Sequence, residues 1–534
     1  MLTPSEKNAL FSLLTKDLSP QKVSFYDPLP KLKLKTLSAQ VKTKSVKVKG
    51  QEVIVRADRS LFARLLIVAQ TRSLNMSVVL CYELGPLPWS LVSVDGSLAK
   101  TAKSKLLDLL EKDIPPAENV PGNAAWMIDA MALLQSLGTI PATFADLAMK
   151  AFDVATAAFL SGSVRIDFVV DRYPTHSIKR CERSQGVKQG IVKINIANLL
   201  QKCPSQWKKY LSLDSNKTNL SEFLLQEWIR PEYAERLHHR LFYVTHDAKC
   251  TLLTSSDGVT VTAQCVADLE CCHEEAATRL LLHAAHAATM GFASVVIRSP
   301  DTDVTILACS LCPGITACIF FRTGTKTRSR FIDIQAVRNS VSENVCDALL
   351  GLHALTGCDT TSAFKRRGKR LFYNYCNRIR NYVMVFNDLV LYGSKTNSIN
   401  DCRYELFSVK GAQGDNLPPT QDALQMHVQR ANYQAAVWVR ALQAKPVVPS
   451  PCGYGWEIVN DQLTMKWMTQ KPTPDDLLVL VNCRCHTGCS SRRRSCVHEG
   501  MPCTDACDCE DCDNQTASCR RETDSEGSDV EAEF

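Results

Sequence analysis

The chain has 534 residues, of which 45% are hydrophobic and 22% charged, enough apolar content for two to four domains with a large core. The start lacks a basic segment followed by an apolar one, and no run of about 18 residues is both apolar and uncharged. These features exclude a secreted or membrane-spanning chain, and we expect a soluble globular protein with no membrane partner.

The net charge of +7 is modest, but it is unevenly distributed. Residues 31–49 are rich in lysine, whereas the C-terminal tail, RETDSEGSDVEAEF, is acidic. A basic segment favours a polyanionic partner. A solvated, lysine-decorated strand or linker explains residues 31–49 equally well.

Apolar periodicity predicts alternating helices and strands along the chain. Helices are expected at 55–70, 103–112, 123–137, 273–290 and across 373–445, buried strands at 165–171 and 293–301, and a strand-rich insertion or edge hairpin with an SSDG turn at 239–270. Alternation of this kind predicts a mostly parallel sheet covered by helices on both faces.

Carboxylates follow or adjoin several of these apolar segments. The pair Asp301 and Asp303, in SPDTD, directly follows the strand expected at 293–301. Such residues commonly cap a turn or a helix, which is one interpretation of the pair. The other is a divalent-metal site, because α/β folds build their sites at the carboxyl ends of parallel strands.

Five short motifs support the second interpretation. In chain order they are IDAMALLQSL, VVDRYPTHSIKRCER, EAAT at the start of a helix, SPDTD and LTGCD. Together they resemble the flap-endonuclease and XPG-type branch of the PIN-like nucleases, over about residues 120–372. The resemblance implies a pocket for two Mg²⁺ or Mn²⁺ ions that activate a water for phosphodiester hydrolysis. The carboxylates that it assigns to this pocket are Asp129, Asp171, Glu275, Asp301, Asp303 and Asp359.

The sequence departs from that family pattern at one position. Ala277 stands where a second helical acid belongs, two residues after Glu275. Glu274 is adjacent, but on a helix it would point about 100° away from Glu275. Whether the site is catalytic is therefore left open by the sequence.

Basic residues surround the same motifs. The resemblance assigns Lys179, Arg180 and Arg183 to clamping the scissile phosphate, and it assigns Arg366, Arg367, Lys369 and Arg370, around Gly368, to the backbone of a DNA duplex. A solvated helical face is the alternative for each group.

Eight cysteines crowd into the C-terminal region, with the spacing C-x-C-x3-C-x6-C-x6-C-x3-C-x-C-x2-C. Thiolates at this density in a chain without secretion signals are typical zinc ligands. The cluster resembles a tesmin-type CXC domain, in which arginines such as Arg492, Arg493 and Arg494 would face DNA. Two or three zinc ions are equally compatible with the eight thiolates. The expected ligands are Cys483, Cys485, Cys489, Cys496, Cys503, Cys507, Cys509 and Cys512.

The combined prediction is an α/β protein with a PIN/flap-endonuclease-like core and a small zinc-cluster domain, as in animal proteins of mobile-element ancestry. We expect a nuclear DNA-binding protein, with RNA also possible, that hydrolyses phosphodiesters; the alternative is a catalytically inactive DNA or chromatin adaptor. The expected parts are a basic leader (1–50), a helical region (51–120), the core (121–372, with an insertion near 190–270), a helical extension (373–445), a linker with a small element (446–480), the zinc domain (481–515) and an acidic disordered tail (516–534).

Overall fold

A computed structural model describes residues 44–48, 51–55, 76–85, 87–93, 96–174, 177–179, 181, 193–325, 328–376, 398–408 and 416–474. The predicted zinc ligands Cys483 to Cys512, the arginines 492–494 and the helix expected at 55–70 lie outside these residues, apart from Val55. The chain divides into Met1–Lys42 and Thr43–Phe534, and every described residue belongs to the second unit.

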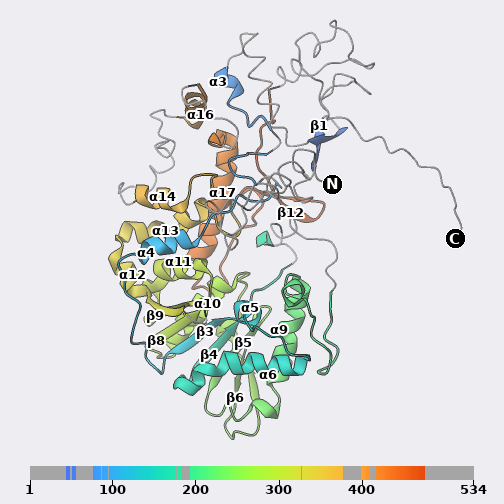
Figure 1. The fold of residues 1–534 in the computed structure, drawn as a ribbon, viewed down its shortest axis with the longest axis vertical. Helices are drawn as coiled ribbons and strands as arrows, with labels where there is room; N and C mark the ends of the chain where they lie inside the picture. Colours follow the sequence, from blue (N-terminus) through green and yellow to red (C-terminus); the bar gives the residue numbers. More distant parts are fainter. Residues whose placement is uncertain are drawn as a thin grey trace, which may run out of the picture. The chain divides into compact units, whose positions relative to one another are not determined.

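The centre of the molecule is an eight-stranded, mostly parallel sheet with helices on both faces (Figure 1). Its strand order is β10-β9-β8-β3-β4-β5-β6-β7; the neighbours from β9 to β5 run parallel, and β10, β6 and β7 join in antiparallel fashion. The predicted α/β class is therefore confirmed. The strands are β3 (Ala125–Asp129), β4 (Arg165–Val169), β5 (Leu241–His246), β6 (Lys249–Thr254), β7 (Thr262–Cys265), β8 (Ser294–Arg298), β9 (Cys318–Thr325) and β10 (Arg328–Asp333).

Alternate strand residues enter two separate hydrophobic cores. Met127 and Val169 face one core, which α10, α11 and α13 cover, whereas Ile128 and Phe168 face the other, which α6 and α9 cover. The helices are α3 (Met76–Val79), α4 (Ser104–Leu110), α5 (Ala130–Gln135), α6 (Phe144–Ala155), α8 (Trp207–Tyr210), α9 (Asp214–Trp228), α10 (Ala276–Thr289), α11 (Thr302–Leu311), α12 (Ile334–Ser340), α13 (Glu343–Leu355), α14 (Lys369–Cys376), α16 (Ile399–Ser408) and α17 (Gln421–Val439).

One sequence prediction needs correction. Residues 123–137 were expected to be one helix, but β3 occupies Ala125–Asp129 and α5 begins only at Ala130, because Asp129 caps that helix by accepting from the backbone N–H of Ala132. Of the two alternatives for 239–270, the structure agrees with the edge hairpin: β5 pairs in parallel with β4, and β6 and β7 follow as antiparallel strands at the sheet edge. The SSDG turn does join two antiparallel strands, β6 and β7.

Two hairpins lie outside the main sheet. Lys44–Val48 (β1) pairs with Gln51–Val55 (β2), at the boundary expected between the leader and the helical region. Trp456–Val459 (β11) pairs with Gln462–Met465 (β12) within the expected linker. No helix in the described part of the chain combines the length and the apolarity that a bilayer crossing requires.

Candidate metal centre

The carboxyl ends of β8, β3 and β4, three neighbouring parallel strands, bring the predicted carboxylates to one edge of the sheet. Asp129 is the last residue of β3, Asp171 follows β4, and Asp301 follows β8. Each of the three carboxylates accepts a hydrogen bond from a backbone N–H in the first turn of a helix, and so lies at the N-terminus of that helix. The donors are Ala132 N to Asp129 (3.0 Å), Ala276 N to Asp171 (2.8 Å) and Asp303 N to Asp301 (3.0 Å).

One group of carboxylates consists of Asp301, Asp303 and Asp359. Each offers an oxygen within 4.8 Å of the others, and among the described residues they are the only group of three or more histidine, cysteine or acidic side chains that meets this spacing. Carboxylate oxygens are the ligands that Mg²⁺ and Mn²⁺ prefer. The donor set therefore fits a divalent cation.

Lys103, just before α4, contacts all three members of this group. Its Nζ lies 2.5 Å from Asp359 Oδ1, 2.8 Å from Asp303 Oδ2 and 3.6 Å from Asp301 Oδ1. Burial opposes the lysine charge, but the surrounding carboxylates outweigh it and raise the pKa of Lys103 well above its ordinary value. The ammonium is thus the counterion of the group.

Asp303 continues into a buried chain of polar contacts. His353, on α13, pairs through Nε2 with Asp303 Oδ1 at 2.7 Å, and its Nδ1 lies 3.0 Å from Lys369 Nζ. Lys369 also donates to the His353 carbonyl (3.0 Å) and to Thr356 Oγ1 (2.9 Å). Such second contacts fix the orientation of a ligand carboxylate.

These contacts separate the pKa values of the neighbouring acids Asp301 and Asp303. Burial, and then the Asp303 charge, raise the pKa of Asp301 to about 7. Although burial disfavours its charge, His353 and Lys103 hold the pKa of Asp303 below its usual range. Asp303 is therefore the more acidic of the two carboxyls and Asp301 the more easily protonated.

A second group consists of Asp129, Asp171 and Glu275. Lys179 Nζ lies 3.9 Å from Asp171 Oδ1 and 3.6 Å from Glu275 Oε1, and Trp438 Nε1 donates to Glu275 Oε2 at 3.0 Å. Burial, and then the Asp171 charge, raise the pKa of Asp129 to about 6. This group too concentrates negative charge at the sheet edge.

Ser299 connects the two groups. Its hydroxyl donates to Asp129 Oδ2 at 3.0 Å and accepts from the backbone N–H of Asp301 at 3.1 Å. The six predicted carboxylates thus form two adjoining groups at one edge rather than six unrelated caps.

The start of α10 changes the expectation about Ala277. Because the helix begins at Ala276, Glu274 and Glu275 both lie in the chain that precedes it, so the argument that Glu274 points 100° away does not apply. Glu274 accepts from the Ser177 hydroxyl, and burial raises its pKa to about 7.

Ala277 is 7% exposed and packs in the hydrophobic core, where an added carboxylate would be buried among apolar side chains.

Of the predicted basic residues, Lys369 is misassigned. It is 1% exposed and bonds inside the fold, so it does not present a charge to a duplex. Arg366 and Arg370 are exposed and Arg367 is half-buried, while Arg180 and Arg183 lie outside the described residues.

Sequence reasoning missed Lys103 and His353. His353 lies six residues before Asp359, on the buried face of its helix, whereas nothing in the local sequence marks Lys103.

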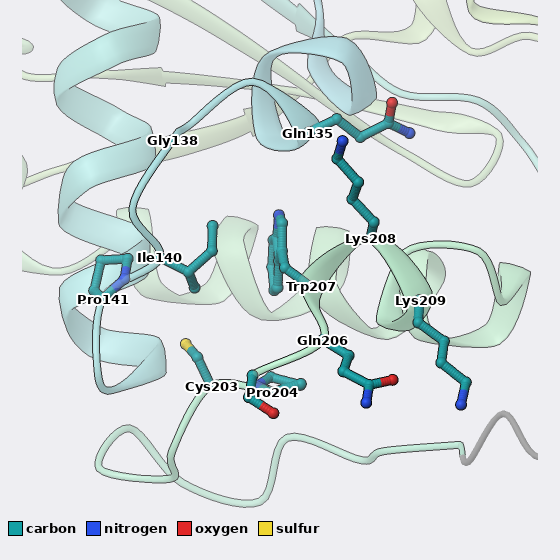
Figure 2. A pocket seen from close by; sticks show the side chains of 11 residues that line it. Gln135, Gly138, Ile140, Pro141, Cys203, Pro204, Gln206, Trp207, Lys208 and Lys209 are labelled. Atoms are coloured by element: carbon teal, nitrogen blue, oxygen red, sulfur yellow. The ribbon is translucent and has the colours of Figure 1, made fainter. Parts of the chain in front are cut away.

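A hollow near this edge of the sheet has a lining unlike that of the two acidic groups (Figure 2). It measures about 620 Å³ and lies between the loop after α5 and residues 203–209. Figure 2 shows Lys208 extending toward Gln135, while Trp207 stands between the two walls and donates to the Leu134 carbonyl at 2.9 Å. Its lining residues include no acid and no histidine, so this hollow adds nothing to the metal centre.

These features define the chain as an α/β protein with an acidic centre at the carboxyl edge of its parallel strands. No family model matches the chain, and no curated protein or solved structure does. The functional argument therefore rests on the site itself.

We expect removal of the Lys103 charge to open the centre to cations. Lys103→Met should raise the affinity for Mn²⁺ by about tenfold or more, because a positive charge a few ångströms from a bound ion opposes binding strongly in a partly buried site. Isothermal titration calorimetry measures the change. Lys105→Met is the matched control, since Lys105 pairs only with exposed Asp108 at 3.1 Å. Equal affinities in the two variants would show that no ion enters this group.

Proposed function

We propose that the protein is a divalent-metal-dependent phosphodiesterase of PIN/flap-endonuclease-like fold that acts on DNA. One observation carries the proposal: three adjacent parallel strands place Asp129, Asp171 and Asp301 at one edge of the sheet, where helix and loop residues add Glu275, Asp303 and Asp359. Two neighbouring acidic groups suit a pair of divalent ions, which stabilise the attacking and leaving oxygens of a phosphodiester.

In this proposal Asp301, Asp303 and Asp359 would hold one ion. Asp129 and Asp171, which adjoin this group through Ser299, would supply ligands to a second ion, with Glu275 nearby. When bound, the ions would polarise the phosphate and make water a stronger nucleophile. The water oxygen forms a bond to phosphorus while the bond between phosphorus and the leaving oxygen breaks; the attacking water gives up a proton to solvent, and the leaving oxygen takes one from solvent.

His353 and Lys369 would affect the proposed reaction only by positioning the Asp303 carboxylate. Their contacts of 2.7 and 3.0 Å hold the carboxylate in one orientation, and the burial of both side chains keeps water away from it. The predicted zinc domain, outside the described residues, would add a second contact with DNA through Arg492, Arg493 and Arg494.

A non-catalytic DNA or chromatin adaptor is the second candidate, and the position of Lys103 favours it. An ammonium that already contacts three carboxylates satisfies their charge without a metal ion. In that case the fold would bind nucleic acid and leave it intact.

The two candidates differ in a cleavage assay with the purified full chain. Flapped, branched and duplex DNA, each fluorescently labelled, are incubated with Mg²⁺ or Mn²⁺, with EDTA as the metal-free control. The phosphodiesterase proposal predicts cleavage that EDTA abolishes. DNA binding without cleavage by the wild type and by Lys103→Met, under every metal condition, would favour the adaptor.

A further inference from the structure

A second cavity opens beside the acidic centre, and its lining also carries positive charge. It measures about 430 Å³, within the usual range for ligand pockets. Its lining includes Asp129 and Ser299 as well as Arg298 and Arg322. The cavity therefore joins the proposed metal centre to two guanidinium groups.

The two arginines lie next to each other because the sheet register pairs them. Arg298, at the end of β8, is the register partner of Arg322 on the parallel strand β9. Paired residues of neighbouring strands project from the same face of a sheet, about 5 Å apart along the hydrogen-bonding direction. Two like charges are thus held side by side.

No carboxylate within the described residues neutralises this pair. Neither arginine forms a hydrogen bond or an ion pair with any described residue. Burial, and then the Arg322 charge, lower the pKa of Arg298, and burial alone lowers that of Arg322. Both side chains are half-buried, so solvent screens the two like charges only in part, and an anion between them would be favourable.

Aromatic rings hold Arg322 in place without using its N–H donors. Its guanidinium carbon lies 5.5 Å from the ring centre of Trp126 and 5.8 Å from that of Phe331. Stacking of this kind orients the planar group while its donors remain available, and a guanidinium matches the oxygens of a phosphate.

The surrounding lining is compatible with an anion. Thr323 and Ser329 add hydroxyl groups, and Gly324 adopts a positive φ of 103°, which bends the end of β9 away from a regular strand. Asp129, which belongs to the proposed metal centre, is the one acid in the lining. The cavity therefore combines groups suited to an anion with one carboxylate of the metal centre.

We propose that Arg298 and Arg322 bind a phosphate group of the nucleic-acid strand next to the phosphate at the metal centre. This inference deepens the proposed function and rests on it for the identity of the strand. The phosphate is either a terminal monoester or an internal diester, and the two sources share the same chemistry.

The test measures binding in EDTA, so that cleavage plays no part. Fluorescence anisotropy follows one single-stranded oligonucleotide, labelled at its 3′ end, in two forms that carry a 5′-phosphate or a 5′-hydroxyl. The variants are the double substitution Arg298→Gln with Arg322→Gln and the control Arg330→Gln. Arg330 lies on the adjacent strand β10, is exposed, and pairs with Glu111 at 2.6 Å outside the cavity.

The double variant should bind at least about tenfold more weakly than the wild type, since each charge-assisted hydrogen bond is strong, while Arg330→Gln should stay within about twofold. A loss confined to the 5′-phosphorylated form identifies a terminal monoester, and an equal loss for both forms identifies an internal diester. If the double variant binds both forms as well as Arg330→Gln does, the inference is overturned.

Two further measurements keep the outcome clear. If the double variant unfolds, Arg322→Lys is measured in its place, because lysine keeps the positive charge but lacks the planar guanidinium. Binding at least about threefold weaker than that of the wild type supports the site, and unchanged binding overturns it. If the arginine substitutions weaken phosphate binding in a protein that neither cleaves DNA nor binds Mn²⁺, the anion site is supported and the phosphodiesterase proposal fails.

Discussion

Asp301→Asn is expected to lower metal-dependent DNA cleavage by about 100-fold or more while leaving the fold intact. Asparagine caps a helix as well as aspartate does, so the bond from the Asp303 N–H survives the substitution. What is lost is a negative charge and a strong ligand for a divalent ion. The measurement pairs the cleavage rate in saturating Mn²⁺ with the thermal midpoint of unfolding.

Asp333→Asn is the matched control for this substitution. Asp333 is the last residue of strand β10 and caps a helix by accepting from Gln335 N (2.9 Å) and Ala336 N (3.1 Å), but it lies outside the acidic centre. Both cleavage and thermal midpoint should be unchanged in this variant. If Asp301→Asn behaves in the same way, Asp301 is only a helix cap and the metal centre does not exist.

Asp167→Ala is expected to cost about 3–5 kcal/mol in the free energy of unfolding, the usual range for leaving a buried charge without its partner. Asp167 is fully buried on β4 and accepts two bonds of 2.8 Å from Arg165 and one of 2.7 Å from His283. Its removal leaves the Arg165 guanidinium inside the core without a counterion. Urea unfolding followed by circular dichroism provides the measurement.

Asp153→Ala provides the comparison for a surface ion pair. Asp153 is 56% exposed and lies 3.4 Å from Arg236, so its loss should cost less than about 1 kcal/mol. Similar unfolding midpoints for Asp167→Ala and Asp153→Ala would contradict a structural role for the buried pair.

The pH dependence of the Asp167 effect follows from its pKa. Burial opposes the charge of Asp167, but Arg165 and His283 outweigh it and lower the pKa below the ordinary value. The unfolded chain therefore binds the proton more tightly, and the stabilisation is present above the unfolded pKa of about 3.9 and is lost as the pH falls below it. The difference between wild type and Asp167→Ala should hold from pH 7 to pH 5 and shrink below about pH 4.

The sequence by itself determined the α/β class and the buried strands at 165–171 and 293–301, because runs of apolar residues and their period are local properties. It also marked Asp171, Asp301 and Asp303 at the ends of expected strands, and the resemblance of five short motifs to a nuclease family added Asp129, Glu275 and Asp359.

The strand assigned to β3 escaped sequence reasoning because AWMID and AMALLQ form one continuous apolar run, in which the cap at Asp129 is the only break. The start of α10 was expected at His273 but lies at Ala276, so Glu274 precedes the helix. The residue at which a helix begins depends on which backbone N–H groups are hydrogen-bonded by side chains elsewhere in the fold.

Only the tertiary structure decided which side chains meet. Lys103 reaches Asp303 across 200 positions of sequence, Lys369 turns inward to His353, and Arg298 lies beside Arg322 because β8 and β9 pair in register. Charge pairing, burial and strand register act between residues that are distant in the chain, so no local pattern contains them. The order of the strands is what brought the acidic centre and the arginine pair to one cavity.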